Sequence, residues 1–268
     1  MTGALAVNNA EYPWDLFDSE SYQQRNYATL HELDQIIIPL LARFFDEQDL
    51  PRHSAAIDVG PGTNLYPAMA MLPFAETITL WEYSSANVVW LEQEIGRYRR
   101  SWDDFWQALV RSCDRYRAIR PAELLPQVVK IEKGSIFDLE EGRWDLGTMF
   151  FVAESITGML DECATATTRF VRSLKPGAPF AATFMEGSRG YVVGDHTFPA
   201  VAVTEQDVHD ILRDVARDVT LHPIRSPQLF RHGYDGMMLV TGVRSDTPST
   251  WVQHGSGSGT NQRKEWSA

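Results

Sequence analysis

The residues that most constrain the fold of this chain form a buried strand, a glycine turn and the start of a helix in segment 55–66. The segment reads AAIDVGPGTNLY, in which Asp58 lies two residues before Gly60, and Gly62 follows. A second apolar strand comes after the helix and runs into Glu82. This order is the layout of a nucleotide-binding βαβ unit: a strand, a glycine turn, a helix and an acid at the end of the next strand. The glycines let the backbone approach the ligand, and the carboxylate accepts hydrogen bonds from ribose hydroxyls.

The rest of the chain continues this alternation of strands and helices. The expected later strands cover residues 128–131, 144–152, 179–185, 219–222 and 234–243. A helix over 161–174 ends at the stop signal Lys-Pro-Gly of 175–177, and an earlier helix over 30–45 contains Pro39, which predicts a kink or a break. The glycine-containing stretch 186–191 is interpreted as a flexible connection. The pattern predicts an α/β fold with a mostly parallel sheet and a closing antiparallel hairpin.

The composition favours one sizeable core with extensions. The chain has 268 residues, of which 44% are hydrophobic, and this is enough apolar material for a single central domain. We expect a helical extension over 1–50 that begins with a loose tail at 1–10, a central domain over 51–244 and a flexible tail over 245–268. An aromatic and charged stretch at about 97–127 interrupts the alternation of strands and helices, and we interpret it as an insertion.

The charge and the cysteine content disfavour several functional classes. The net charge is −12, which argues against broad binding to nucleic acid or to anionic membranes because phosphate contacts need a basic face. Cys113 and Cys163 are too few for a disulfide framework or a zinc site, and no apolar run is long enough to span a membrane. We therefore expect a cytoplasmic protein without a metal, a nucleic acid or a membrane as partner, present as a monomer or a weak homodimer.

The residues after the second glycine discriminate between classes of nucleotide. A dinucleotide motif needs a third glycine where this chain has Leu65. The pattern Asp-x-Gly-x-Gly-Thr over 58–63 instead resembles the first motif of class I S-adenosylmethionine-dependent methyltransferases, and 174–177 is similar to their Leu-Lys-Pro-Gly turn. This resemblance implies a Rossmann-like, mostly parallel sheet of seven strands with a C-terminal antiparallel hairpin. It also implies S-adenosylmethionine as cofactor and S-adenosylhomocysteine as product.

The front half of the chain is similar to a narrower group, the nicotinamide, phenylethanolamine and thioether methyltransferase family. The similar parts are a helix with Tyr22 and Tyr27, the segments 57–66 and 82–87, and an aromatic insertion around 104–106. The resemblance implies that the N-terminal helix forms a lid over the cofactor.

The same resemblance implies a set of cofactor-binding residues. They are Tyr22, Tyr27, Asp58, Gly60, Gly62, Thr63, Tyr66, Glu82, Tyr83, Asn87, Ser135, Ile136 and Phe151. By the resemblance, the glycine turn lines the methionine part, Tyr66 bonds to its carboxylate and Glu82 holds the ribose hydroxyls. Ser135 and Ile136 border the adenine, although the family often has an acid where this chain has Ser135.

The candidate catalytic residues lie at the carboxyl ends of strands, where open α/β sheets bind ligands. They are Glu154 and Glu186, and the resemblance places an acid that contacts a substrate nitrogen at the position of Glu186. A neutral nitrogen needs no base before attack, whereas a hydroxyl would need one, for which His31, His196 and Glu186 are the candidates. We expect methyl transfer to a small-molecule amine or ring nitrogen. The alternatives are O- or C-methylation in natural-product tailoring, and a module that binds the cofactor without turnover.

Overall fold

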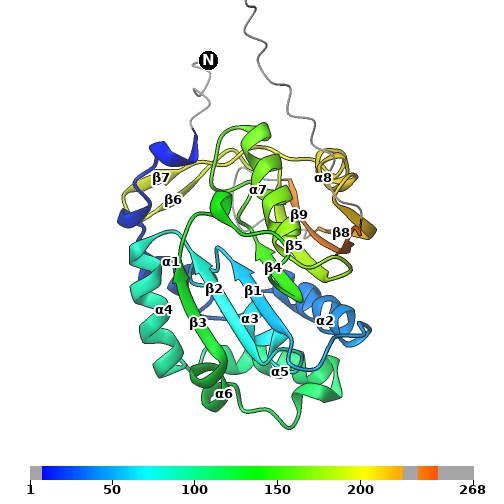
Figure 1. The fold of residues 1–268 in the computed structure, drawn as a ribbon. Helices are drawn as coiled ribbons and strands as arrows, with labels where there is room; N and C mark the ends of the chain where they lie inside the picture. The colour runs from blue at the N-terminus through cyan, green and yellow to red at the C-terminus, as the bar shows by residue number, and fades with distance from the viewer. Residues whose placement is uncertain (1–7, 226–234, 247–268) are drawn as a thin grey trace, which may run out of the picture.

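The computed structural model describes residues 8–225 and 235–246 and shows one central sheet with helices on both faces (Figure 1). The predicted tail at 245–268 lies outside the described residues from residue 247 onward. The domain boundaries expected from the sequence stay a prediction.

The central sheet has seven strands in the order β3-β2-β1-β4-β5-β9-β8. The strands are β1 (Ala55–Val59), β2 (Thr77–Glu82), β3 (Val129–Lys133), β4 (Leu146–Phe150), β5 (Pro179–Glu186), β8 (Ala216–Ile224) and β9 (Gly236–Arg244). The first five strands run parallel, and β9 is antiparallel to both β5 and β8. The prediction of a mostly parallel sheet of seven strands with a closing antiparallel hairpin is therefore confirmed.

Helices cover both faces of this sheet, because successive side chains of the strands point to opposite sides. The helices are α1 (Ser19–Asn26), α2 (Glu32–Asp46), α3 (Tyr66–Met71), α4 (Ser85–Arg97), α5 (Trp102–Ser112), α6 (Pro121–Val128), α7 (Leu160–Ser173) and α8 (Glu205–Leu212). Ala56 of β1 belongs to the core cluster shared with α2 to α6, whereas Ile57 and Val59 belong to the cluster shared with α7 and α8. Helix α2 runs unbroken through Pro39, so the predicted break is wrong; its buried face holds the helix together across the proline.

The stretch interpreted as an insertion contributes to the first of these cores. Trp102 and Phe105 of α5 are fully buried, and the Phe105 ring stacks on Tyr66 of α3 with centroids 5.7 Å apart. Helix α5 therefore buries its aromatic face in this core.

Short elements gather at the carboxyl edge of the sheet. They are the 3-10 turns η1 (Asn9–Glu11), η2 (Trp14–Leu16) and η4 (Ile136–Asp138), and the separate hairpin of β6 (Tyr191–Val193) and β7 (His196–Phe198). A further 3-10 turn, η3 (Asp114–Tyr116), follows α5. The blue N-terminal segment lies beside β6 and β7 in Figure 1, and its Trp14 and Phe17 form a small aromatic core with Phe198.

Candidate functional site

A pocket lies where β1, β2 and β4 end, which is where open parallel sheets bind ligands. Its open space, counted with the solvent at its mouth, is about 850 Å³. Most of the residues implied by the sequence meet in its wall. These are Tyr22, Tyr27, Gly60, Gly62, Thr63, Glu82, Tyr83, Asn87, Ser135, Ile136 and Phe151.

The glycine turn after β1 forms the floor of the pocket. Gly60 and Gly62 have φ angles of +62° and +56°, a region that L side chains rarely adopt. A Cβ on Gly60 would lie 2.8 Å from the side chain of Val152, so space as well as backbone conformation requires glycine there. The turn can hold its shape only with these two residues.

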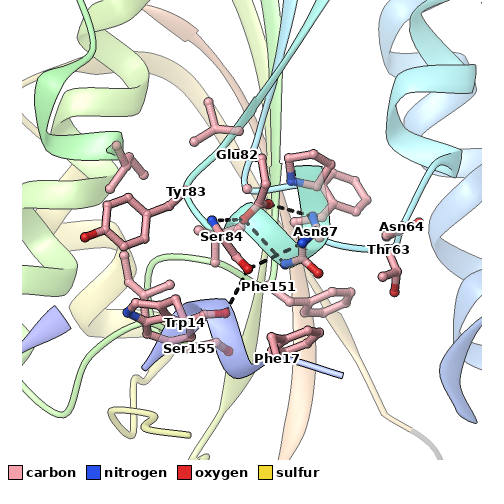
Figure 2. Close-up of a pocket in the computed structure, with 18 of the residues that line it drawn as sticks. Trp14, Phe17, Thr63, Asn64, Glu82, Tyr83, Ser84, Asn87, Phe151 and Ser155 are labelled. Carbon is pink, nitrogen blue, oxygen red and sulfur yellow. Dashed lines mark hydrogen bonds between the residues drawn. The ribbon is translucent and has the colours of Figure 1, made fainter. Parts of the chain in front are cut away.

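The carboxylate of Glu82 is fixed in the wall at the end of β2. Its Oε2 accepts a hydrogen bond of 3.0 Å from the backbone N–H of Gly62. Its Oε1 accepts from the Ser84 N–H at 2.8 Å and from Asn87 Nδ2 at 3.4 Å (Figure 2). Burial raises the pKa of Glu82, and these donors oppose that rise because they favour the charged form. A carboxylate oxygen accepts two hydrogen bonds, so Oε2 still has capacity for a ligand donor.

Two polar groups of the turn lack a partner within the described residues. Thr63 Oγ1 and Asn64 Nδ2 are both buried and both unpaired there, and both residues line the pocket (Figure 2). Asn64 Oδ1 accepts from the backbone N–H of Tyr66 at 3.2 Å, which fixes the amide with its N–H₂ end unpaired. Because leaving a buried polar group unpaired is costly, these atoms indicate that a polar ligand belongs here. The sequence reasoning missed Asn64, although it stands next to the glycine motif.

The opposite side of the pocket is a flat wall built on Trp81. The indole Nε1 donates to the Ser135 carbonyl at 3.0 Å, which joins β2 to the loop after β3. A Cβ on Gly134 would lie 2.2 Å from the same indole, so the two residues fit only as a pair. The hydroxyl of Ser135 accepts from the Phe137 N–H at 3.2 Å and thereby caps η4. Neither Trp81 nor Gly134 was predicted as a site residue.

An N-terminal strap, defined here as residues 9–17, crosses the pocket from outside. Asn9 donates its backbone N–H to Glu162 Oε2 at 2.9 Å and its Nδ2 to the Ile156 carbonyl at 3.1 Å. Ser84 Oγ donates to the carbonyl of Trp14 at 2.8 Å (Figure 2). The expectation of a loose tail at 1–10 is wrong for residues 8–10, which are ordered by these bonds and by η1.

Aromatic side chains from helix α1 and the β6–β7 hairpin complete the cover. Tyr22 lies on α1, and Tyr27 is the residue at its C-terminal cap. Phe198 stacks on Trp14 of the strap, with centroids 5.2 Å apart, and on Tyr191 at 5.6 Å. The stretch read as a flexible connection thus leads into an ordered hairpin, and the pocket is closed by segments from both halves of the chain.

Two of the implied cofactor residues lie outside the pocket wall. Asp58 is buried beneath the turn, where its Oδ1 accepts from Thr148 Oγ1 at 2.8 Å, and burial raises its pKa to about 8. Tyr66 is fully buried with its ring against Phe105, so the implied contact with a cofactor carboxylate has no geometric support. Both side chains support the turn from below.

The two candidate catalytic acids also lie outside the pocket wall. Glu154 is fully buried, its Oε1 accepts from the Met185 N–H at 3.0 Å, and burial raises its pKa to about 7. Glu186 forms an ion pair of 2.6 Å with Arg225. A position at the end of a strand does not decide on which face a side chain points, because successive residues alternate. Ser155, the neighbour of Glu154, does line the pocket (Figure 2).

Two further expectations concern metals and membranes. Within 8–225 and 235–246, no three His, Cys, Asp or Glu side chains are grouped as metal ligands would be. No helix among the residues that the structure describes is both long and apolar enough to cross a membrane.

Comparisons with known proteins bear on the fold. No protein-family model and no curated protein sequence matches the chain. A solved structure described as "Conversion of a Disulfide Bond into a Thioacetal Group during Echinomycin Biosynthesis" has a TM-score of 0.51 and 14% identity, and the match covers 84% of this chain and 85% of that one. The [4+2]-cyclase SpnF has a TM-score of 0.50 and 16% identity, with 79% and 80% covered.

The N-methyltransferase NodS from Bradyrhizobium japonicum WM9, crystallised with S-adenosyl-L-homocysteine, has a TM-score of 0.49 and 13% identity, with 81% and 89% covered. The strand order described above, together with the two structures at TM-scores of 0.50 and 0.51, carries the conclusion about the fold. The chain has a Rossmann-like α/β fold, which it shares with these two structures.

Proposed function

We propose that the protein binds S-adenosylmethionine in this pocket and transfers its methyl group to a small-molecule acceptor. The observation that carries the proposal is the buried carboxylate of Glu82, which is held against the glycine turn at the end of β2 and retains an acceptor position. A carboxylate in that place suits a ribose. The fully buried Leu65 stands where a pyrophosphate-binding turn would need its third glycine, which argues against a dinucleotide.

The pocket wall divides into parts that suit the parts of this cofactor. Glu82 would accept from the ribose hydroxyls, and Trp81 with Ile136 would enclose the adenine. Thr63 and Asn64 would pair with the polar groups of the amino-acid end, which would satisfy their buried hydroxyl and amide. When bound, the cofactor supplies a methyl group on a sulfonium for an in-line displacement. The protein's own part is to orient the two reactants and exclude water, which the strap and the lid helix favour by covering the pocket.

We infer that the acceptor is a small molecule with a nucleophilic nitrogen. The net charge of −12 disfavours a nucleic acid, and the sequence resemblance favours an amine or ring nitrogen. Neither Glu186 nor the histidines His31 and His196 line the pocket, so none of the three bases considered for a hydroxyl acceptor lies in that wall. The resemblance to the narrower nicotinamide, phenylethanolamine and thioether family, the cytoplasmic location and the monomeric or weakly dimeric state belong to the same proposal.

A second candidate is a protein that binds the cofactor without methyl transfer. SpnF has the same fold and is described as a [4+2]-cyclase, so this fold by itself does not require methyl transfer. The pocket suits either candidate, since both require the same cofactor contacts.

The test is incubation of the protein with S-adenosylmethionine carrying a labelled methyl group and a panel of amines, azaheterocycles and phenols. We expect label on amines or azaheterocycles. Label on phenols alone would move the acceptor to oxygen, and calorimetric binding without label on any compound would favour the second candidate.

A matched pair of variants locates the activity in this pocket. Glu82→Gln keeps the size of the side chain and removes its charge, and we expect about 10- to 100-fold weaker binding of S-adenosylhomocysteine because hydrogen bonds to charged groups contribute about 1.5–3 kcal/mol. Glu76→Gln changes an exposed acid at the other end of the same strand and should leave binding unchanged. Equal binding by both variants would contradict the role of Glu82.

A further inference from the structure

Arg99 joins the lid helix to the body of the molecule. Helix α4 ends at Arg97, and Tyr98 with a φ of +47° turns the chain so that Arg99 comes back alongside the helix. Its guanidinium lies over the ring of Trp90, 5.5 Å from the centroid. Two carboxylates, from Glu94 and Glu20, meet it from opposite sides.

One of these two contacts belongs to the body of the molecule. Arg99 Nε donates to Glu94 Oε2 at 2.7 Å, and the Arg99 backbone N–H donates to Glu94 Oε1 at 3.1 Å. The indole of Trp102 on α5 donates to Glu94 Oε1 at 2.8 Å. The Glu94 side chain is only 1% exposed, so releasing its bonds to the guanidinium would leave a buried carboxylate short of donors. This side of the Arg99 contact is permanently anchored.

The other contact belongs to the lid helix α1. Arg99 Nη1 and Nη2 donate to the two carboxylate oxygens of Glu20, each at 2.6 Å, and Nη1 also donates to Gln23 Oε1 at 3.2 Å. The Glu20 side chain is 54% exposed. Water can therefore replace the guanidinium at Glu20 at little cost, which is not so at Glu94. The two halves of the contact differ in how readily they open.

An adjacent side of α1 faces the pocket. Tyr22 lies in the pocket wall, and Ser19 Oγ donates to Asn87 Oδ1 at 2.7 Å. The same Asn87 donates to Glu82 through its Nδ2. Whatever holds α1 in place thus also holds the residues that close the pocket. Helix α1 packs against α4 at this edge.

We propose that Arg99 is a positioning residue that latches α1 over the pocket, with Glu94 as the fixed half of the latch and Glu20 as the half that opens. The latch sets how long a ligand stays bound. The lid movement breaks the bonds to Glu20 and keeps those to Glu94. Only the identity of the ligand rests on the proposed function, because the latch itself is a property of the free protein.

The test compares Glu20→Gln and Arg99→Lys with the wild-type protein. Glu20→Gln removes the charge from the opening half and leaves the fixed half intact, whereas Arg99→Lys keeps the charge and loses the two-pronged geometry. We expect amide hydrogen exchange of residues 19–27 in the free protein to become about three- to tenfold faster in both variants. The dissociation rate of S-adenosylhomocysteine should rise by a similar factor, while the midpoint of global unfolding of Glu20→Gln should stay unchanged.

Arg115→Met is the matched control. Arg115 also lies over an aromatic ring, that of Phe74 at 5.6 Å, and also pairs with an acid, Asp46, but far from α1. Exchange at 19–27 that stays at the wild-type rate in Glu20→Gln, or that rises equally in Arg115→Met, would overturn the latch. Failure of the wild-type protein to bind S-adenosylhomocysteine would instead count against the proposed function, and the exchange measurement would still decide the latch.

Discussion

At the scale of single residues, the end of β4 carries a conformation that the backbone rarely adopts. Phe151 has a φ of +58°, and for a bulky residue this costs about 1–3 kcal/mol. Its N–H still bonds to the Thr183 carbonyl at 3.0 Å, so the chain keeps its strand pairing while the ring turns into the pocket wall. The expected strand over 144–152 is shorter for this reason and ends at Phe150. Strain of this kind is characteristic of binding sites.

Replacing glycine by alanine is expected to change the stability of the fold in opposite directions at two sites, Gly60 in the glycine turn and Gly96 in α4. Gly60→Ala forces a side chain into the left-handed region and against Val152, and should lower the free energy of unfolding by about 1–3 kcal/mol. Gly96→Ala, in α4 with open space around it, should raise that free energy by about 0.5–1 kcal/mol. Urea unfolding measures both values. Equal effects at the two sites would contradict the geometry described for the turn.

Asp58 predicts a dependence of stability on pH. Its pKa is raised from 3.8 to about 8 by burial, so the folded state holds this proton more tightly than the unfolded chain. The free energy of unfolding therefore falls as the pH rises through this window, and Asp34 and Glu154, with pKa values raised to about 7, act in the same direction. Asp58→Asn cannot ionise, so its stability should fall less steeply between pH 5 and pH 8 in urea titrations, with Asp114→Asn, a substitution of an exposed acid, as control. An unchanged slope in Asp58→Asn would show that this carboxyl is not protonated in the folded state.

The sequence predicted pocket-wall residues that local patterns or the family resemblance mark, in several separate segments of the chain. Gly60, Gly62 and Glu82 are marked by local patterns, because glycine turns and strand-end acids are recognised by their immediate neighbours. Trp14 reaches the pocket from far away in the chain, and no local pattern marks such a residue. Glu186 lies outside the pocket wall and pairs with Arg225, which follows β8, and the sequence of β5 alone does not reveal such a partner.

At the scale of elements, α5 shows how a helix can be predicted without its role. The spacing of its aromatic residues indicates a helix, but it does not name the surface against which those residues pack. The structure places them against α2 and α3, with Tyr27 6.0 Å from Trp102 between ring centroids. The hairpin of β6 and β7 was not predicted at all. Its strands have three residues each, which is too short for an alternation of apolar and polar residues to be recognised.

The buried position of α5 predicts a large cost for truncation. Phe105→Ala removes a ring that stacks on Tyr66 and contacts Trp102, and should lower the free energy of unfolding by about 3–5 kcal/mol. Val89→Ala, on the exposed side of α4, should change it by less than about 0.5 kcal/mol. Chemical denaturation at one pH provides the comparison. A small effect of Phe105→Ala would contradict the buried packing of α5 described above.

At the scale of the whole molecule, the pocket is assembled from segments that are spread over residues 9–198. The floor comes from β1 and β2, the far wall from the loop after β3, and the cover from the strap, α1 and the β6–β7 hairpin. A ligand enclosed by so many elements binds the folded state and not the unfolded chain. Binding must therefore raise the stability of the entire fold.

This linkage predicts a thermal shift that discriminates between cofactors. S-adenosylhomocysteine at 100 times its Kd should stabilise the fold by about 2.7 kcal/mol, which corresponds to about 5–10 °C in Tm for a chain of this size. NAD at the same concentration should leave Tm unchanged, because Leu65 replaces the glycine that a pyrophosphate site needs. Differential scanning calorimetry measures both shifts. A shift with NAD alone would restore the dinucleotide hypothesis.

The contacts of the strap also determine when, during synthesis of the chain, the pocket can be covered. Asn9 bonds to Glu162, 153 residues later, and Trp14 stacks on Phe198. A ribosome adding about 5–20 residues per second needs roughly 10–40 s to pass from Asn9 to Phe198. The strap is therefore synthesised well before its partners, and the growing chain can form the floor of its pocket before it can complete the cover. The molecule can close over its pocket only after Phe198 has been translated.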